Sequence, residues 1–344
     1  MMPTRYQPQG HWMSGHNGPY FSNRPLYGNH NDAYILAGDK PLLRFTKQHC
    51  VMGTLELAAE LSDGCKPLHE CADIVFRYTA GMAEWVIRDA AFDGAVTLRA
   101  GTPENRNALI VRVTAERPLP LLWRYGGLAK LEGCFGIDPL AEDRELLDKD
   151  FFPAFCSNNR IAVSGDSFVI HNPLLWKTLG APYCMAGSCS AGTLETADGC
   201  VSGRFSASPA PVYLTVSLQT TPSPVRENLP ALYDSARRRA RSLRRRIVVQ
   251  TPDAYLDTFT RNVAAEIDGA WYPPVNVHNT TAWNEPYLGW CNRFGNTFCG
   301  WFDRMTAEIR HYLACQEKKD VRWGAEADPD YLLTKAAPTS RLYG

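Results

Sequence analysis

The sequence predicts a mainly β protein with C-terminal helices: a large antiparallel β-sandwich, a connecting helix and a helical hairpin. Two observations lead to this fold class. Ten short segments between residues 33 and 218 read as strands separated by turns, with no long helical pattern between them. After Pro224 the hydrophobic period changes to that of amphipathic helices. Many short strands without intervening helices are typical of a sandwich and not of a parallel α/β sheet.

Several of the predicted strands alternate as half-buried strands do. Leu214, Val216 and Leu218, for example, would share one face of a sheet. Asp-Gly pairs that begin at Asp63 and Asp93 supply the turn chemistry between strands. The predicted strands span residues 33–38, 42–46, 54–61, 74–78, 84–89, 95–100, 109–115, 121–125, 167–171 and 212–218.

A Pro-rich linker at residues 220–224 precedes an Arg-rich helical segment at residues 232–248. Seven arginines lie between Arg237 and Arg246. Such a run indicates either a nucleic-acid patch or a connecting helix whose arginines pair with acidic residues of the neighbouring domain. Lys plus Arg and Asp plus Glu both total 36, and no basic surface extends the run. We therefore favour the second interpretation and predict no nucleic-acid partner.

Two more helices form the predicted hairpin. Thr251 is the predicted N-cap of the first, with Pro252 at the first helical position and Asp253 in the first turn, and this helix runs to about residue 270. The second spans about residues 297–316, and its apolar residues recur with the spacing of one buried face. Those residues are Phe298, Trp301, Phe302, Met305, Ile309, Tyr312 and Leu313.

Other classes of function lack their signatures. The 11 cysteines include no CxxC pair, and only Cys184 and Cys189 lie close enough to invite a metal interpretation, so we predict thiols and no metal site. No P-loop or dinucleotide fingerprint is present, and no cofactor is predicted. No segment has the apolar length of a membrane span, and residues 1–15 show no signal peptide.

The segment between the two hairpin helices combines aromatic, amide, imidazole and carboxylate side chains. Sugars need this mixture, because their C–H faces stack on aromatic rings while their hydroxyls bond amides and carboxylates. Alternatively, Trp283 and Trp290 fill the gap between hairpin and sandwich while His278 and Asn284 hold the backbone. The predicted substrate-binding residues are Trp271, Tyr272, His278, Trp283, Asn284, Tyr287 and Trp290.

Glycoside hydrolysis ordinarily requires two carboxyl groups, one protonated and one ionised. Glu285, inside the aromatic segment, is the first catalytic candidate. Asp268 is the second candidate, and like Glu266 it ends the first hairpin helix, where a catalytic and a structural role are both open. Asp303 lies among core positions of the next helix, which favours a structural role. The residues alone do not provide a convincing pair.

Two long motifs resemble a known family. The stretches SNRPLYGNHNDAYILAGDKPLLRF and AAEIDGAWYPPVNVHNTTAWNEPYLGW look like those of an uncharacterised bacterial family, number 4450 among the domains of unknown function. Members of that family resemble six-hairpin glycosidases and occur with glycan-degrading systems. The resemblance extends from about residue 20 to 343. It implies a sandwich at residues 1–222, a linker helix at 223–250 and the start of an (α/α) toroid at 251–344.

The same resemblance implies an oligo- or polysaccharide partner and a periplasmic or secreted location. Family members are longer, so we expect this chain to be the N-terminal part of a glycoside hydrolase-like protein, catalytically incomplete by itself. The alternative is a non-catalytic carbohydrate-binding or structural module. A toroid that stops after one hairpin would expose apolar surface around Trp301 and Tyr312, and this surface predicts self-association.

Overall fold

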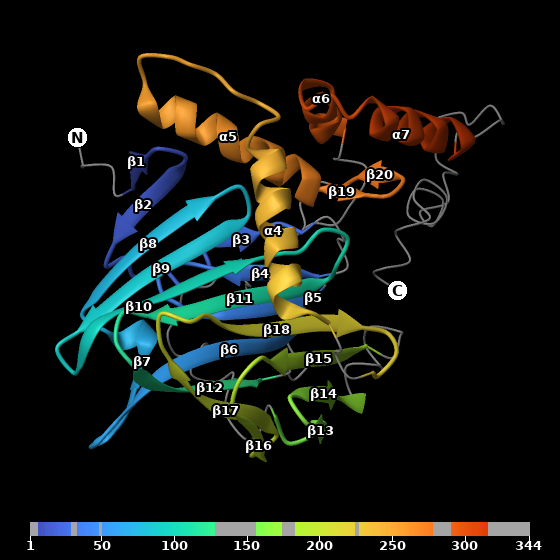
Figure 1. Ribbon diagram of the computed structural model, residues 1–344. Coiled ribbons are helices and arrows are strands. Elements are labelled where there is room, and N and C mark those ends of the chain that lie inside the picture. Colours follow the sequence, from blue (N-terminus) through green and yellow to red (C-terminus); the bar gives the residue numbers. More distant parts are fainter. Residues whose placement is uncertain are drawn as a thin grey trace, which may run out of the picture.

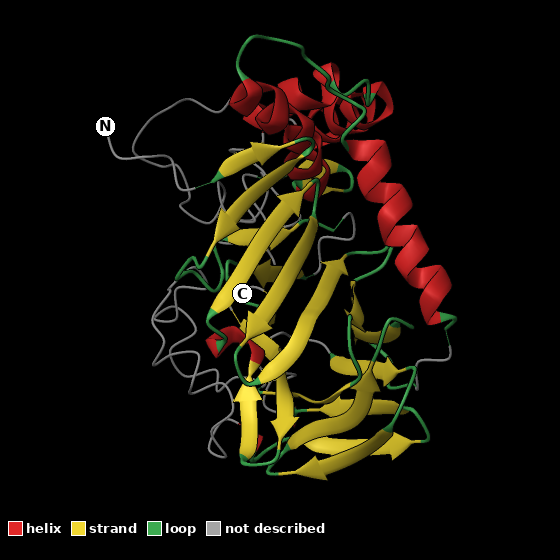
Figure 2. Ribbon diagram, turned by 60° about the vertical axis from the view of Figure 1, so that its left-hand side comes forward, coloured by secondary structure: helices red, strands yellow, loops and turns green. Residues whose placement is uncertain are grey.

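The computed structural model describes residues 6–28, 33–47, 50–127, 156–173, 183–223, 227–277 and 290–315. Two antiparallel sheets enclose the main core, and the helices lie along one sheet and across one end of the sandwich (Figures 1 and 2). The predicted class, an antiparallel β-sandwich followed by C-terminal helices, is confirmed.

The larger sheet has ten strands in the spatial order β1-β2-β8-β9-β10-β11-β18-β15-β14-β13, and every neighbouring pair within it is antiparallel. Its strands are β1 (Gln7–Gln9), β2 (Trp12–His16), β8 (Asp73–Thr79), β9 (Met82–Asp89), β10 (Phe92–Gly101), β11 (Ala108–Ala115), β18 (Val212–Gln219), β15 (Cys184–Cys189), β14 (Ser167–His171) and β13 (Arg160–Ser164).

The smaller sheet has eight strands in the order β16-β17-β12-β6-β5-β4-β3, with β7 paired to β6. Its strands are β16 (Thr193–Ala197), β17 (Cys200–Ala207), β12 (Leu119–Gly126), β6 (Cys50–Leu61), β5 (Leu43–Lys47), β4 (Tyr34–Ala37), β3 (Arg24–Leu26) and β7 (Gly64–Pro67); a short 3-10 turn, Leu68–Glu70, follows β7.

The main core fills the space between the sheets. Trp85 of β9 is fully buried, packs against Phe76 at a ring-centroid distance of 5.6 Å, and donates its indole N–H to Gly38 O at 2.9 Å. Tyr125 of β12 donates to Met52 O at 2.9 Å. Each large ring thus contributes buried apolar area and also satisfies a backbone carbonyl, which for Trp85 belongs to the facing layer and for Tyr125 to the neighbouring strand β6 of its own sheet.

Each of the ten predicted strands corresponds to an observed one. The missed strands are short or rich in Gly, Ser, Pro and Cys, which gives them little strand signal. One missed strand, β15, contains both Cys184 and Cys189. These residues are five apart in a strand, so they face opposite sides: Cys189 lies in the main core and Cys184 in a small outer cluster.

The connecting helix, α4 (Leu229–Leu243), is shorter than predicted and lies along the outer face of the larger sheet (Figure 2). Asn228 caps it by accepting the N–H of Ala231 at 3.1 Å. Its apolar face, which includes Tyr233 and Ala236, is buried in a second core with residues of the sheet and of the next helix. Of the arginine run within α4, only Arg239 is buried.

The next helix, α5 (Ala254–Gly269), ends where it was predicted to end but is capped by a different residue. Asp253 Oδ1 accepts the N–H of Tyr255 at 2.8 Å and that of Leu256 at 3.4 Å, whereas the Thr251 hydroxyl bonds Asp257. The prediction of Thr251 as N-cap is therefore wrong, because the carboxylate two residues later reaches the free N–H groups better.

The predicted single helix at 297–316 is two helices, α6 (Trp290–Phe298) and α7 (Phe302–Cys315). Gly300, at φ +70°, turns the chain between them. The predicted buried face is also wrong. Trp301 is buried, but the inward residue of α7 is Glu308, and five large apolar side chains of the two helices are exposed. Those side chains, the apolar face of α6 and α7, are Phe294, Phe298, Phe302, Ile309 and Leu313.

Candidate functional site at the C-terminal end of α5

A small hairpin continues the chain directly after α5. It consists of β19 (Trp271–Tyr272) and β20 (Val275–Asn276), joined through a cis Pro273-Pro274 bond. Asn276 donates its side-chain amide to Glu308 Oε2 at 2.8 Å, and both residues are fully buried. Glu308 therefore faces inward in α7 because it supplies the acceptors that this hairpin requires.

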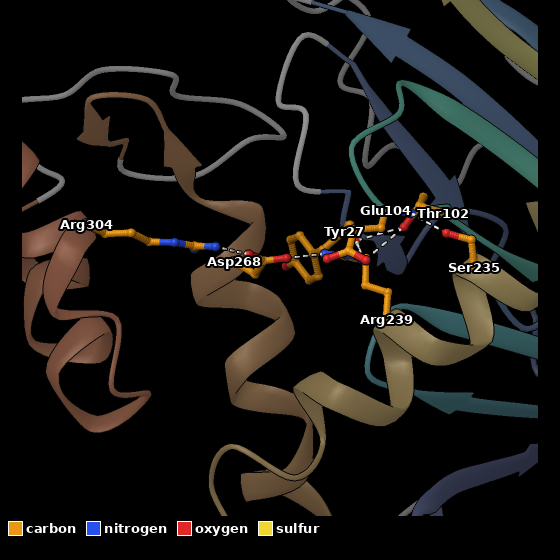
Figure 3. A network of polar contacts seen from close by, with 7 residues as sticks. All are labelled: Tyr27, Thr102, Glu104, Ser235, Arg239, Asp268 and Arg304. Atoms are coloured by element: carbon orange, nitrogen blue, oxygen red, sulfur yellow. Dashed lines mark hydrogen bonds and ion pairs between the residues drawn. The ribbon is translucent and has the colours of Figure 1, made fainter.

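A buried carboxylate holds the end of α5 in place. Asp268 is paired through Oδ2 with Arg239 of α4 at 2.5 Å and through Oδ1 with Arg304 of α7 at 2.6 Å (Figure 3). The side chains of Asp268 and Arg239 are only 4% exposed. Charge-assisted bonds to both oxygens offset the loss of hydration that such burial entails.

Arg239 extends this network into the sandwich. Its Nη1 donates to the backbone oxygen of Tyr27 at 2.6 Å and to Thr102 Oγ1 at 3.1 Å, and the Thr102 hydroxyl donates to the same Tyr27 oxygen at 3.0 Å (Figure 3). Tyr27 follows β3 and Thr102 follows β10. One guanidinium thus connects both sheets to α5, which is the pairing predicted for the whole run; Arg237 instead pairs with Asp234 of its own helix.

Arg304 connects the network to aromatic rings. Its guanidinium carbon lies 4.1 Å from the ring centroid of Trp301 and 5.5 Å from that of Trp271. Trp271, a predicted sugar-binding residue, is 9% exposed and belongs to this stack, while Tyr272 is half-buried. Trp271 therefore offers a ligand little more than one edge.

Glu266 lies two residues before Asp268 in a different environment. Its side chain reaches solvent, but the surrounding protein removes part of its hydration, and this desolvation raises the pKa of Glu266 against the opposing effect of Arg24. Burial first, and then the charge of Glu266, raise the pKa of Tyr27. Similar causes raise the pKa of Tyr78, whose hydroxyl bonds Pro25 O at 2.8 Å.

Glu266, Arg24, Tyr27 and Tyr78 form what we call the Glu266 cluster. The close fit of the Tyr27 ring against Gly269, where a Cβ atom would come within 2.5 Å of that ring, holds the helix end and the residues after β3 together. The cluster joins an accessible carboxyl of raised pKa to a cation and a phenol. This combination can donate a proton and bond hydroxyl groups. The sequence placed Glu266 among the carboxyl candidates but did not rank it above Glu285 and Asp268, because its neighbours in the fold lie more than 180 positions away.

The remaining predicted site residues lie outside the described part of the chain. They are His278, Trp283, Asn284, Glu285 and Tyr287, and of Trp290 only the backbone, at the start of α6, is described. The catalytic roles of Glu285 and Asp268 and the substrate-binding set stay predictions. For Asp268, the geometry adds that both oxygens are occupied by arginines.

Two further observations concern the described ranges alone. Within them, no cluster of three His, Cys, Asp or Glu side chains is arranged to hold a metal ion. No helix in those ranges combines the length and apolar character needed to cross a membrane.

Replacing Asp268 tests its role as the structural anchor. Asp268→Asn would leave the buried Arg239 without its counter-charge, and breaking such a pair costs about 3–5 kcal/mol of unfolding free energy. Urea denaturation measures this loss. The matched control is Asp234→Asn, which removes the exposed pair with Arg237 on α4 and should cost less than about 0.5 kcal/mol. Equal losses in the two variants would contradict the anchor role.

Solved structures share this fold. A bacterial glucoamylase complexed with acarbose superposes with a TM-score of 0.50 at 8% identity, over 86% of this chain and 50% of that one. A putative kojibiose phosphorylase from the human microbiome gives a TM-score of 0.47 at 9% identity, over 84% of this chain and 46% of that one. The chain thus spans about half the length of these proteins.

No protein-family model and no curated protein matches the sequence. At 8% identity, the similarity to the glucoamylase establishes architecture alone. The protein therefore has a β-sandwich with adjoining helices, an architecture that it shares with the matched part of this glucoamylase.

Proposed function

We propose that this chain is the N-terminal part of a glycoside hydrolase-like protein and binds an oligo- or polysaccharide beside the C-terminal end of α5. The observation that carries the proposal is the Glu266 cluster, an accessible carboxyl of raised pKa in a fold shared with a glucoamylase. The domain arrangement that accompanies it is the sandwich at 1–222, the linker helix at 223–250 and the start of a toroid at 251–344.

Hydrolysis of a glycosidic bond needs a proton donor near the glycosidic oxygen. A carboxyl whose pKa is raised by desolvation keeps its proton closer to neutral pH than an ordinary glutamate. Glu266 meets this condition, and we assign to Arg24 and Tyr27, whose charge or pKa is coupled to it, the bonding of sugar hydroxyls. Glu285, in the aromatic segment that follows the hairpin, is the proposed second carboxyl. Asp268 then positions the segment, because its oxygens are held by two arginines.

The aromatic segment supplies the proposed stacking surface. Trp271 and Tyr272 begin it at the hairpin, and Trp283, Tyr287 and Trp290 continue it. Since Trp271 is buried against Arg304, we assign the stacking role first to Trp283. His278 and Asn284 would bond hydroxyl groups of the bound sugar.

We also propose that this chain is not catalytically complete. A toroid collects its active centre from several hairpins, and the chain spans half the length of the glucoamylase. The apolar face of α6 and α7 supports this proposal, since Phe298 is 77% exposed and Leu313 is 63% exposed. Membership in family 4450 and a periplasmic or secreted location, both implied by the sequence motifs, accompany the proposal.

One observation favours a non-catalytic glycan-binding module instead. Both oxygens of Asp268 are engaged in ion pairs, and no second carboxyl belongs to the Glu266 cluster among the described residues. To distinguish an enzyme from a binding module, Glu266→Gln is introduced into a longer gene product, and hydrolysis and glycan affinity are both measured. An enzyme loses hydrolysis and keeps glycan affinity, whereas a binding module has no hydrolysis to lose.

Glycan binding by this chain is the direct test of the proposal. We expect calorimetry against plant and host polysaccharide fragments to detect binding, and Trp283→Ala to weaken it at least about tenfold through loss of stacking. Phe259→Ala is the control, because this α5 side chain is 57% exposed and lies outside the proposed site. Absence of glycan binding by the unmodified chain would overturn the proposal.

The pH dependence of stability tests the environment of Glu266. A raised pKa means that the folded state binds the proton more tightly than the unfolded state, so stability falls as pH rises from about 4.5 through the raised value. Glu266→Gln removes this loss. Its Tm, relative to the unmodified protein, should therefore be higher at about pH 7 than at about pH 4. The control, Glu104→Gln at an exposed position, should show no such trend. A Tm difference for Glu266→Gln that does not change with pH would contradict the raised pKa of Glu266.

Exposure of the apolar face predicts self-association. Sedimentation should show a mass that increases with concentration, and Phe298→Ser combined with Leu313→Ser should shift the protein toward monomer. Phe259→Ser removes an equally exposed ring from α5 and should leave the association unchanged. A monomer at every concentration would contradict self-association through this face.

A further inference from the structure

Two cysteines face each other near the side of the sandwich where the edge strands β13 and β16 of the two sheets meet. Cys156, just before β13, and Cys200, the first residue of β17, have their sulfur atoms 3.5 Å apart, and the Cys200 thiol donates to Cys156 Sγ. The strand β13 is the last of the larger sheet, and β17 carries the last strand of the smaller sheet, β16. The thiol pair thus lies between the free edges of the two sheets.

Two glycines allow the backbone to lie close to the two cysteines. A Cβ atom on Gly126, at the end of β12, would lie 2.3 Å from Cys200 Sγ, and one on Gly199 would lie 2.1 Å from Cys156 O. Gly199, at φ +71°, is also the second residue of the Asp198-Gly199 turn between β16 and β17. Any larger residue at these two positions would push the sulfur atoms apart.

Hydrogen bonds fix the segment that carries Cys156. Gly127 donates its N–H to Cys156 Sγ at 3.1 Å, and Asn159 donates its own N–H to Cys156 O at 2.9 Å. The side chain of Asn159 donates to Gly199 O at 2.8 Å, which ties this segment to the turn before Cys200. The two sulfur atoms are therefore held together by the surrounding backbone and not by flexible side chains alone.

We propose that Cys156 and Cys200 form a disulfide that cross-links the segment before β13 to β17 at this side of the sandwich. The proposal does not depend on the glycan-binding function. The bond would enclose the residues between positions 156 and 200, which include β13, β14, β15 and β16, strands of both sheets. A cross-link over a separation of 44 positions restricts the unfolded chain substantially.

A low-molecular-weight disulfide such as oxidised glutathione is the oxidant. The hydrogen bond to Cys156 and burial raise the pKa of the Cys200 thiol, but Cys200 is half-buried whereas Cys156 is fully buried, so Cys200 is the thiol that an oxidant reaches. Cys200 therefore loses its proton to solvent, attacks the oxidant first and releases one glutathione thiolate. Cys156 then loses its proton, attacks Cys200 Sγ of the mixed disulfide and releases the second glutathione. Two protein thiols are oxidised to one S–S bond and one oxidant disulfide is reduced to two thiols.

Other cysteines provide a matched comparison. Cys184 is fully buried in β15, and its thiol donates to Gln219 O with an Sγ–O distance of 3.5 Å. Cys189, in the same strand, faces the opposite side. Cys184→Ser therefore removes a buried thiol from the enclosed segment without touching the proposed bond, whereas Cys200→Ser removes the bond itself.

The test treats the full chain with oxidised glutathione or with dithiothreitol, alkylates remaining thiols under denaturing conditions, and identifies linked peptides by mass spectrometry. We expect a Cys156–Cys200 peptide pair in the oxidised sample and a rise in Tm of roughly 5 °C or more over the reduced sample. Cys184→Ser should keep both effects, and Cys200→Ser should lose both.

The peptide map remains decisive even where a variant folds poorly, since it is read on the unmodified chain. Alkylation of Cys156 and Cys200 after oxidation, a stable glutathione adduct on Cys200, or a bond from either residue to another cysteine would each overturn the proposal.

Discussion

The pairing of Asp268 with Arg239 and Arg304 is the constraint on which the arrangement of helices and sandwich depends. Ions with so little exposure are costly to bury, and the cost is offset only when both partners take the correct positions. Arg239 of α4 also bonds the Tyr27 backbone and Thr102, so a shift of α5 would separate Asp268 from a guanidinium that both sheets hold in place. The network therefore fixes the position of the C-terminal end of α5, while Asn262 and Thr258 bond Ala80 and Gly10 farther along the same helix.

The sequence predicts the sandwich well because strand alternation is a local property. The alternation of residues such as Leu214 and Val216 predicts which face of the strand is buried, without knowledge of distant partners. The same reasoning fails for α6 and α7. Their apolar spacing predicts one buried face, but the buried Asn276 needs the carboxylate of Glu308, and this long-range contact turns the side of α7 that carries Glu308 inward. A helical repeat of apolar residues shows that a helix is amphipathic, but it does not show which side of the helix another segment will cover.

The candidate site was only partly predictable for the same reason. Its place after α5 follows from the local density of aromatic, amide and carboxylate residues. The partners of Asp268, however, lie 29 and 36 positions away, and Arg24, which acts on Glu266, belongs to the first strand of the smaller sheet in chain order. The arginine run identified the helix that would supply an ion pair, but only the packing of α4 shows that Arg239 is the member turned inward.

Helix geometry explains how two carboxyl groups so close in sequence acquire different chemistry. Residues two apart in an α-helix point about 200° from each other, so Asp268 faces the arginines of α4 and α7 while Glu266 faces the residues around β3. The first environment supplies two positive charges and the second mainly removes water. A carboxyl held by two arginines and a carboxyl that holds its proton more tightly thus arise within one helical turn. Had the arginines faced position 266, this helix end would carry no group suited to donate a proton.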